Sequence, residues 1–160
     1  MGKSLDRLQK VVRGELPPPP VAKLIGFRLS SIKPGEAVIE LETNESHANP
    51  LGTLHGGILC DIADAAMGLS FATTLEDDES FTTIELKINF LRAVKLLPPA
   101  SPVSPESSVL KDKLRAIGKI VKRGRNIGLT ECDVLNSAGD LVARASSTCM
   151  VLRGGQARSS

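Results

Sequence analysis

The feature that most constrains the fold is an apolar segment from Ile58 to Thr74, which directly follows the sequence NPLGTLHGG at residues 49–57. Apolar and small side chains occur all round the helical wheel of this segment, which predicts a helix buried on most of its sides. The segment is too short, and too often interrupted by charge, to cross a bilayer. The rest of the chain is therefore expected to pack around one long central helix.

Two carboxylates, Asp61 and Asp64, interrupt this apolar segment. A carboxylate in a buried helix is unfavourable unless it is paired, hydrogen-bonded or hydrated. At a spacing of three residues the two share a face of the helix and could act as a pair. Asp61 is interpreted as a partly exposed polar position. Asp64 is the candidate for chemistry, because an apolar helix is a poor place for a carboxylate without a function.

The spacing of His55 and Asp64 constrains how the two could cooperate. Nine residues correspond to about two and a half helical turns, so the side chains point to opposite sides and lie roughly 13 Å apart along the axis. They cannot form one site within one copy of the helix. A second copy running antiparallel would bring the histidine end of one chain to Asp64 of the other. The spacing therefore predicts a site shared across a symmetric dimer.

The composition excludes several classes of function. A length of 160 residues fits one domain with a substantial core. The net charge of +2, together with the lack of Trp and Tyr, argues against a nucleic-acid-binding protein. Two histidines and no Cys-x-x-Cys argue against a metal site. The three cysteines are expected to be free thiols, and residues 1–15 contain no apolar run typical of a signal peptide, so a cytoplasmic protein is predicted.

Three parts are expected along the chain. Residues 1–20 comprise a helix over residues 4–12 and a stiff connector of four prolines. Residues 21–152 form the main domain, and residues 153–160 form a polar tail. Within the domain, residues 94–109 are rich in Pro and Ser and are expected to be an irregular insertion.

Alternating patterns predict six strands around the helix, at residues 27–32, 37–42, 81–91, 111–122, 126–136 and 141–152. The first two flank a Pro-Gly turn and form a hairpin. In the third, Ile84 and Leu86 are expected on one face, and Thr83 and Glu85 on the other. Short connections favour antiparallel pairing. The predicted fold class is α+β, with a long central helix wrapped by a curved antiparallel sheet.

The pattern Asn49-x5-His55-Gly56-Gly57, with Asp64 nine residues after the histidine, resembles the acyl-CoA thioesterases of the hotdog fold. The nearest resemblance is to the phenylacetic-acid-pathway (PaaI) type, and it extends over about residues 21–152. It implies hydrolysis of an acyl-CoA to a free acid and coenzyme A without a metal or other cofactor. It also implies a homodimer that assembles into a homotetramer, and no nucleic-acid or membrane partner.

The same resemblance implies roles for individual residues. Asn49 and Gly56 match the pair that holds the thioester carbonyl and positions water, and His55 matches the residue that organises this loop. Asp64 matches the catalytic carboxylate, contributed by the partner subunit, as a general base or a nucleophile. Thr83 matches a hydroxyl beside that carboxylate. A glycine N–H at a helix N-terminus is a preformed donor for the carbonyl oxygen as it gains negative charge.

Three further residues are candidates for substrate binding. Gly57 allows the backbone to approach a ligand closely. Arg123 and Arg125 resemble basic residues that meet the phosphates of coenzyme A, although a solvated turn is an equal alternative. His55 could likewise be only a helix cap.

Two other functions stay open for a protein of this fold. A hotdog dehydratase or hydratase would need local His and carboxylate motifs that this sequence lacks. A non-catalytic acyl-CoA-binding protein would need the pocket but not Asp64.

Overall fold

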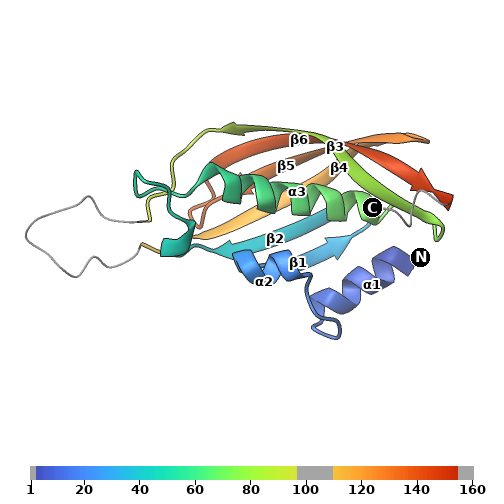
Figure 1. Cartoon of the computed structure of the whole chain (residues 1–160), viewed down its shortest axis with the longest axis horizontal. Helices are drawn as coiled ribbons and strands as arrows, with labels where there is room; N and C mark the ends of the chain where they lie inside the picture. The colour runs from blue at the N-terminus through green and yellow to red at the C-terminus, as the bar shows by residue number, and fades with distance from the viewer. Residues whose placement is uncertain (1–2, 97–109, 155–160) are drawn as a thin grey trace, which may run out of the picture.

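The computed structural model describes residues 3–96 and 110–154 (Figure 1). Its helices and strands follow the predicted order. They are α1 (Lys3–Val12), α2 (Pro20–Ile25), β1 (Phe27–Lys33), β2 (Glu36–Glu42), the 3-10 turn η1 (Glu45–His47), α3 (Gly56–Ala72), β3 (Glu79–Phe90), β4 (Lys113–Arg123), β5 (Ile127–Leu135) and β6 (Leu141–Arg153).

The six strands form one antiparallel sheet in the order β1-β2-β4-β5-β6-β3. Helix α3 lies along one face of this sheet, and α1 and α2 lie beside β1 (Figure 1). The predicted α+β class, with a long helix packed on an antiparallel sheet, is confirmed. The sheet order leaves β1 and β3 as its two edges, and β3 is the longer of them.

Helix α3 is central because its apolar and small residues allow close packing. Ile62, Ala66 and Met67 are fully buried against the sheet. A Cβ atom added to Gly118 of β4 would lie 2.3 Å from the backbone carbonyl of Ala66. Only glycine at this position lets the sheet come so close to the helix. The helix begins at Gly56, two residues before the predicted start, because His55 caps it.

Strand β3 departs from the predicted alternation of faces. Its pairing with β6 shifts register between Thr83 and Glu85, so the strand contains a bulge at Ile84. Leu86 and Ile88 pack on the core, whereas Ile84 is 52% exposed. The prediction that Ile84 shares a face with Leu86, and that Thr83 points away, was wrong. One extra residue reverses the faces of a strand, so Thr83 points toward α3.

The N-terminal helix is attached to the body of the protein. Leu5 is 3% exposed, and the Lys3 Nζ atom lies 3.1 Å from Asp77 Oδ2. Of the predicted insertion at residues 94–109, Val94 and Leu96 are buried. Residues 97–109, and residues 155–160 of the predicted tail, lie outside the described part of the chain.

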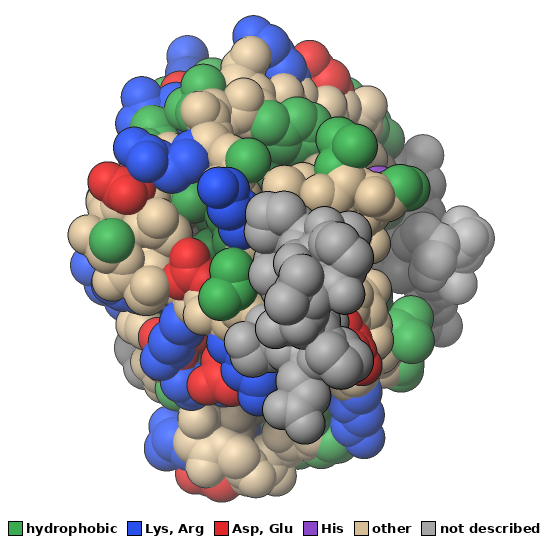
Figure 2. Space-filling view, turned by 90° about the vertical axis from the view of Figure 1, so that its left-hand side faces the viewer, with side chains coloured by type: hydrophobic (Ala, Val, Ile, Leu, Met, Phe, Trp, Pro, Cys, Tyr) green, Lys and Arg blue, Asp and Glu red, His purple; other side chains and the backbone are tan. Residues whose placement is uncertain are grey.

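On the end of the molecule turned to the viewer in Figure 2, basic side chains are interspersed with acidic ones. No helix in residues 3–96 and 110–154 is long and apolar enough to cross a membrane.

Candidate active site

The loop before α3 is folded by the side chain of Asn49. Its Oδ1 atom accepts hydrogen bonds from the backbone N–H groups of Leu51 and Thr53, at 2.9 and 3.2 Å. Its Nδ2 atom donates to Thr53 Oγ1 at 2.8 Å. An amide nitrogen carries two N–H donors, so one remains for a ligand. Asn49 therefore holds the loop and still presents a donor.

His55 is the N-cap of α3. Its Nδ1 atom accepts a hydrogen bond from the Gly57 N–H at 2.8 Å, so Nδ1 carries no proton in this arrangement. The cap that the sequence offered as an alternative is therefore present. It occupies the N–H of Gly57, and within the described residues the Gly56 N–H has no acceptor. That N–H points out of the positive end of the helix dipole.

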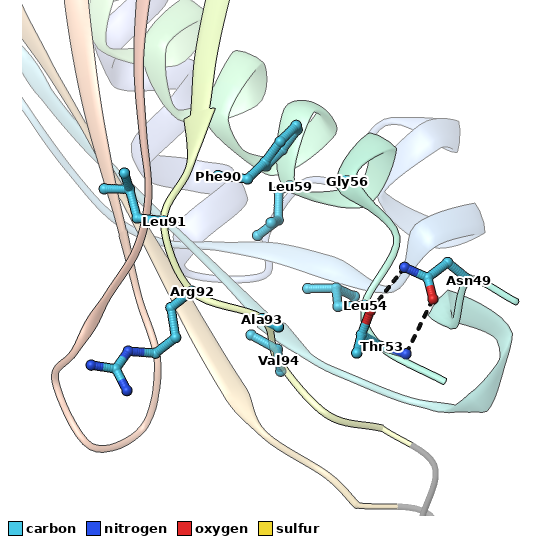
Figure 3. Close-up of a pocket in the computed structure, with 10 residues that line it drawn as sticks. All are labelled: Asn49, Thr53, Leu54, Gly56, Leu59, Phe90, Leu91, Arg92, Ala93 and Val94. Atoms are coloured by element: carbon cyan, nitrogen blue, oxygen red, sulfur yellow. Dashed lines mark hydrogen bonds between the residues drawn. The ribbon is translucent and has the colours of Figure 1, made fainter. Parts of the chain in front are cut away.

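Asn49 and Gly56 line one cavity of about 400 Å³, whose other walls are largely apolar (Figure 3). Phe90 lies directly against the first turn of α3 in this cavity. A Cβ atom on Gly56 would lie 2.9 Å from Phe90 Cζ, so the close contact requires glycine. The sequence did not predict this role of Phe90. The result is a largely apolar pocket, with Thr53 and Arg92 among its lining residues, that contains two amide donors.

Asp64 and Thr83 line a second cavity of about 460 Å³. The Thr83 Oγ1 atom donates a hydrogen bond to Asp64 Oδ1 at 3.1 Å. Asp64 is half-buried, and no cation within the described residues forms an ion pair with it. A carboxylate offers about four acceptor positions, so most of those on Asp64 are open to water or a ligand.

Asp61 lies on the exposed side of the same helix, as predicted. Burial and then the negative charge of Asp64 raise the pKa of Asp61. Burial, followed by Asp61 and Asp64, raises the pKa of the Cys60 thiol, so Cys60 is a neutral thiol at pH 7. All three cysteines are free.

The two halves of the expected site are separate within one chain. Asn49 and Gly56 belong to one cavity, whereas Asp64 and Thr83 belong to the other. Eight residues separate Gly56 from Asp64 on α3, which corresponds to about 12 Å along the helix axis.

Arg123 is engaged within the protein. Its Nη2 atom lies 2.8 Å from Glu79 Oε2, and its guanidinium carbon lies 5.2 Å from the centroid of the Phe71 ring. Arg153 Nη2 binds the other oxygen of Glu79 at 2.7 Å. Sequence reasoning missed this cluster because its members are distant along the chain. The side chain of Arg125 is exposed, and within the described residues it donates no hydrogen bond.

The Glu79 carboxylate is 6% exposed between these two arginines. Its burial by itself would raise its pKa. The Glu76 N–H and the two guanidinium groups outweigh that effect and lower the pKa of Glu79 below its ordinary value. Among residues 3–96 and 110–154, no group of three or more His, Cys, Asp or Glu side chains is placed to hold a metal ion.

Comparison with known proteins gives consistent matches over most of the chain. Residues 16–151 match the model of a domain of unknown function, DUF4442. Human acyl-coenzyme A thioesterase 13 is 25% identical over 121 residues, covering 75% of this chain and 76% of that protein. The 1,4-dihydroxy-2-naphthoyl-CoA hydrolase of Listeria monocytogenes is 36% identical over 67 residues, covering 42% of this chain and 54% of the hydrolase.

The fold also matches a solved structure. The PaaI protein from the phenylacetic acid degradation operon of E. coli superimposes with a TM-score of 0.73, covering 96% of this chain and 98% of that one at 19% identity.

Proposed function

The chain belongs to the DUF4442 family and to the hotdog-fold thioesterase superfamily, and from this premise we propose that it hydrolyses acyl-CoA thioesters to a carboxylic acid and coenzyme A. Two of its relatives carry names of enzymes that act on coenzyme A thioesters. We propose further that Asp64 is the catalytic carboxylate and that each active site is shared by two subunits.

The observation that carries the proposal is the Asp64 carboxylate itself. It lies in an otherwise apolar helix, on a cavity wall, with one hydroxyl as its hydrogen-bond donor. A carboxylate without a cation keeps its lone pairs available to a water molecule or to a carbonyl carbon. The Thr83 hydroxyl fixes one oxygen and leaves the other to react.

The complementary half is the N-terminus of α3. The Gly56 N–H donates to the thioester carbonyl oxygen, on which negative charge accumulates in the transition state. The helix dipole strengthens this interaction. The free N–H of the Asn49 amide supplies a second donor from the same cavity.

Two routes of hydrolysis fit these groups. In the first, the Asp64 carboxylate removes a proton from water as the water oxygen adds to the carbonyl carbon, and the coenzyme A thiolate leaves. In the second, the carboxylate oxygen attacks the carbonyl carbon and displaces the thiolate to form an anhydride, which water then hydrolyses. Both routes yield the same acid and coenzyme A, and both need Gly56 and Asp64 on one thioester.

The edge strand β3 supports the shared site. β3 lies at an edge of the sheet, and Ile84 and Phe90 on it are 52% and 56% exposed. A long exposed edge strand is a template for pairing with another strand. Antiparallel pairing of two β3 strands about a two-fold axis near Leu86 and Lys87 would set Phe90 of one chain opposite Thr83 of the partner subunit. Because Gly56 contacts Phe90 and Asp64 contacts Thr83, this register joins the two halves.

We propose that two such dimers form a homotetramer through the outer face of the sheet. Val121, Ile127 and Leu129 are 52%, 45% and 39% exposed near the turn between β4 and β5. Leu129→Glu should yield dimers that retain activity, as measured by light scattering and turnover. Tetramers in that variant would place the contact elsewhere.

The direct test is release of coenzyme A, followed with a thiol-detecting reagent, across a panel of acyl-CoA substrates. Release above the uncatalysed rate for at least one substrate, lost in Asp64→Asn, supports the proposal. Tight binding without hydrolysis would instead indicate the non-catalytic acyl-CoA-binding protein. Hydration of an enoyl-CoA would indicate the dehydratase or hydratase.

A further inference from the structure

We propose that α1 and the connector at residues 16–19 close an apolar chamber that accepts the distal part of a straight-chain fatty acyl group of medium or long length. This inference rests on the proposed thioesterase function and deepens it by naming the substrate class. It assigns a role to α1, which precedes the residues 16–151 that match the family model.

The chamber has a volume of about 270 Å³. Arg7 is the only charged residue among those that line it, and all the others are apolar. Helix α1 and the connector line one side of it, and residues of α2, β1, β2 and α3 line the other. The principal lining side chains are Leu8, Val11, Leu16, Phe27, Ile39 and Leu69.

The chamber adjoins the cavity that contains Asp64. Pro19, Phe27 and Leu69 line both spaces. Leu69 follows Asp64 by five residues on α3, which corresponds to about 7.5 Å along the helix. In the proposed arrangement the carbonyl carbon of an acyl group lies at Asp64, and its distal carbons pass between the shared residues into the chamber.

Helix α1, which covers the chamber, is packed against the body of the domain. Leu5, Leu8 and Val11 recur at helical spacing on α1, and Leu5 is 3% exposed. The first turn of α1 is held to Asp77, between α3 and β3, by the Lys3 ammonium group at 3.1 Å and by the Lys3 N–H at 3.0 Å. Figure 1 shows both α1 and α2 beside β1. The chamber is thus built by packing and by an ion pair.

Size and polarity select the occupant. An apolar cavity of about 150 Å³ holds a benzene ring, so the chamber has room for about ten carbon atoms. The amides and phosphates of coenzyme A would lose their hydration in such a space without compensation, so they are excluded from it. Three bonds of an extended chain span about 3.5 Å, so a butanoyl group ends before Leu69, whereas a dodecanoyl group passes it.

The test compares two neighbouring positions on α1. Val11 lines the chamber, whereas Val12 is 36% exposed and does not. Val11→Phe fills the chamber. It should lower kcat/KM for dodecanoyl-CoA at least about tenfold, since each buried methylene contributes about fourfold. The same variant should change kcat/KM for butanoyl-CoA by less than about twofold, and the matched control Val12→Phe should change neither.

A second variant acts in the opposite direction. Leu8→Ala enlarges the chamber and should move the optimum to longer chains. Thermal melting shows whether Val11→Phe is folded. If it is not, Leu8→Ala still tests the chamber. Equal losses on butanoyl-CoA and dodecanoyl-CoA, or unchanged chain-length profiles in both variants, would overturn the proposal.

Failure of the proposed function gives a different result. If the wild-type protein hydrolyses no acyl-CoA of any length, the thioesterase assignment fails. The chamber is then judged by calorimetric binding of dodecanoyl-CoA, which Val11→Phe must weaken at least about tenfold and Val12→Phe must leave unchanged. Equal binding by the wild type and Val11→Phe would overturn the chamber independently of catalysis.

Discussion

Two carboxylates at strand β3 are bound in contrasting ways: Asp64 of α3 contacts Thr83 of the strand, and Glu79 is the first residue of the strand. Glu79 is 6% exposed and accepts hydrogen bonds from two guanidinium groups and one backbone N–H. Asp64 is half-buried and, within the part of the chain that the structure describes, accepts one hydrogen bond, from the Thr83 hydroxyl. Glu79 has most of its acceptor capacity filled, whereas Asp64 keeps most of it open toward a cavity.

Under the proposed function, Glu79 stabilises the fold and Asp64 takes part in the reaction. A buried carboxylate that is paired and hydrogen-bonded holds the elements that supply its donors. A carboxylate without a cation can bind water or attack a carbonyl carbon. We therefore expect a substitution of Asp64 to lower turnover but not stability, and a substitution of Glu79 to lower stability but not turnover.

The largest expected effect is on turnover at Asp64. Asp64→Asn keeps the size of the side chain but removes the negative charge, so kcat should fall at least about a hundredfold, the scale of a lost general base. The melting temperature should stay within a few degrees of the wild-type value. Steady-state release of coenzyme A and thermal melting measure the two quantities. Asp61→Asn on the same helix is the matched control, and near-normal turnover in Asp64→Asn would disprove the assignment.

At Glu79 we expect a loss of stability without a loss of turnover. Glu79→Gln leaves Arg123 and Arg153 without their anion, and the free energy of unfolding should fall by about 2 kcal/mol, less than for a fully buried pair because Arg153 is 41% exposed. Chemical denaturation measures this change. Turnover per folded molecule should be unchanged, and the exposed Asp78 provides the control Asp78→Asn. A loss of turnover without a loss of stability would assign Glu79 to the active site.

The pH dependence of stability follows from the same carboxylate. The pKa of Glu79 is lower in the folded protein than its ordinary value. Its contribution is therefore complete above that ordinary value and is lost as the pH falls below it and through the lowered pKa. The wild-type protein should lose stability in this range, and Glu79→Gln should lose less of it. Parallel curves for the two proteins would exclude Glu79 as a source of the acid sensitivity.

The shared site predicts that two inactive variants restore each other. Asn49→Ala lacks the loop half of the site, and Asp64→Ala lacks the carboxylate half. In a mixed dimer one site carries both changes and the other carries neither. Random exchange makes about half the dimers mixed, so activity should return to about a quarter of the wild-type value. The measurement is turnover of each variant alone, and of the mixture after mild denaturation and refolding. A mixture as inactive as its parents, with wild type surviving the treatment, would place the site within one chain.

The sequence predicted the elements of the fold because their signals are local. The apolar run of α3, the Pro-Gly turn between β1 and β2 and the cap at His55 are each determined within a few residues. The face of Thr83 was predicted wrongly from the strand alternation, because the bulge at Ile84 depends on how β3 pairs with β6. No pattern within one strand reports that register.

The contacts of Arg123 and Arg153 with Glu79 also could not be predicted from local sequence patterns. Arg123 lies 44 residues from Glu79, and Arg153 lies 74 residues from it, so only the folded sheet brings them together. The chamber beneath α1 has the same origin, since residues of α1, β1, β2 and α3 meet there. Asp64 became the candidate because it lies in an apolar helix and matches the carboxylate of the hotdog thioesterases, and its catalytic role stays a prediction.

The smallest expected effect concerns Arg125, and it tests whether the Arg-Gly-Arg turn binds coenzyme A. Arg123 is bound to Glu79, whereas the Arg125 side chain is exposed. If Arg125 meets a phosphate, Arg125→Ala should raise KM for an acyl-CoA by about threefold to fivefold, the scale of one exposed charge pair. The KM for the matching acyl-pantetheine thioester, which lacks the nucleotide phosphates, should not change. Added salt should reduce the difference between the variant and the wild type, because screening weakens an exposed ion pair. Arg123→Ala should instead lower stability, since it removes one of the two cations of Glu79. An unchanged KM on both substrates for Arg125→Ala would show that the turn is a solvated surface, and equal increases on both would exclude a contact with the nucleotide phosphates. Either result would leave Arg123 with only its structural role.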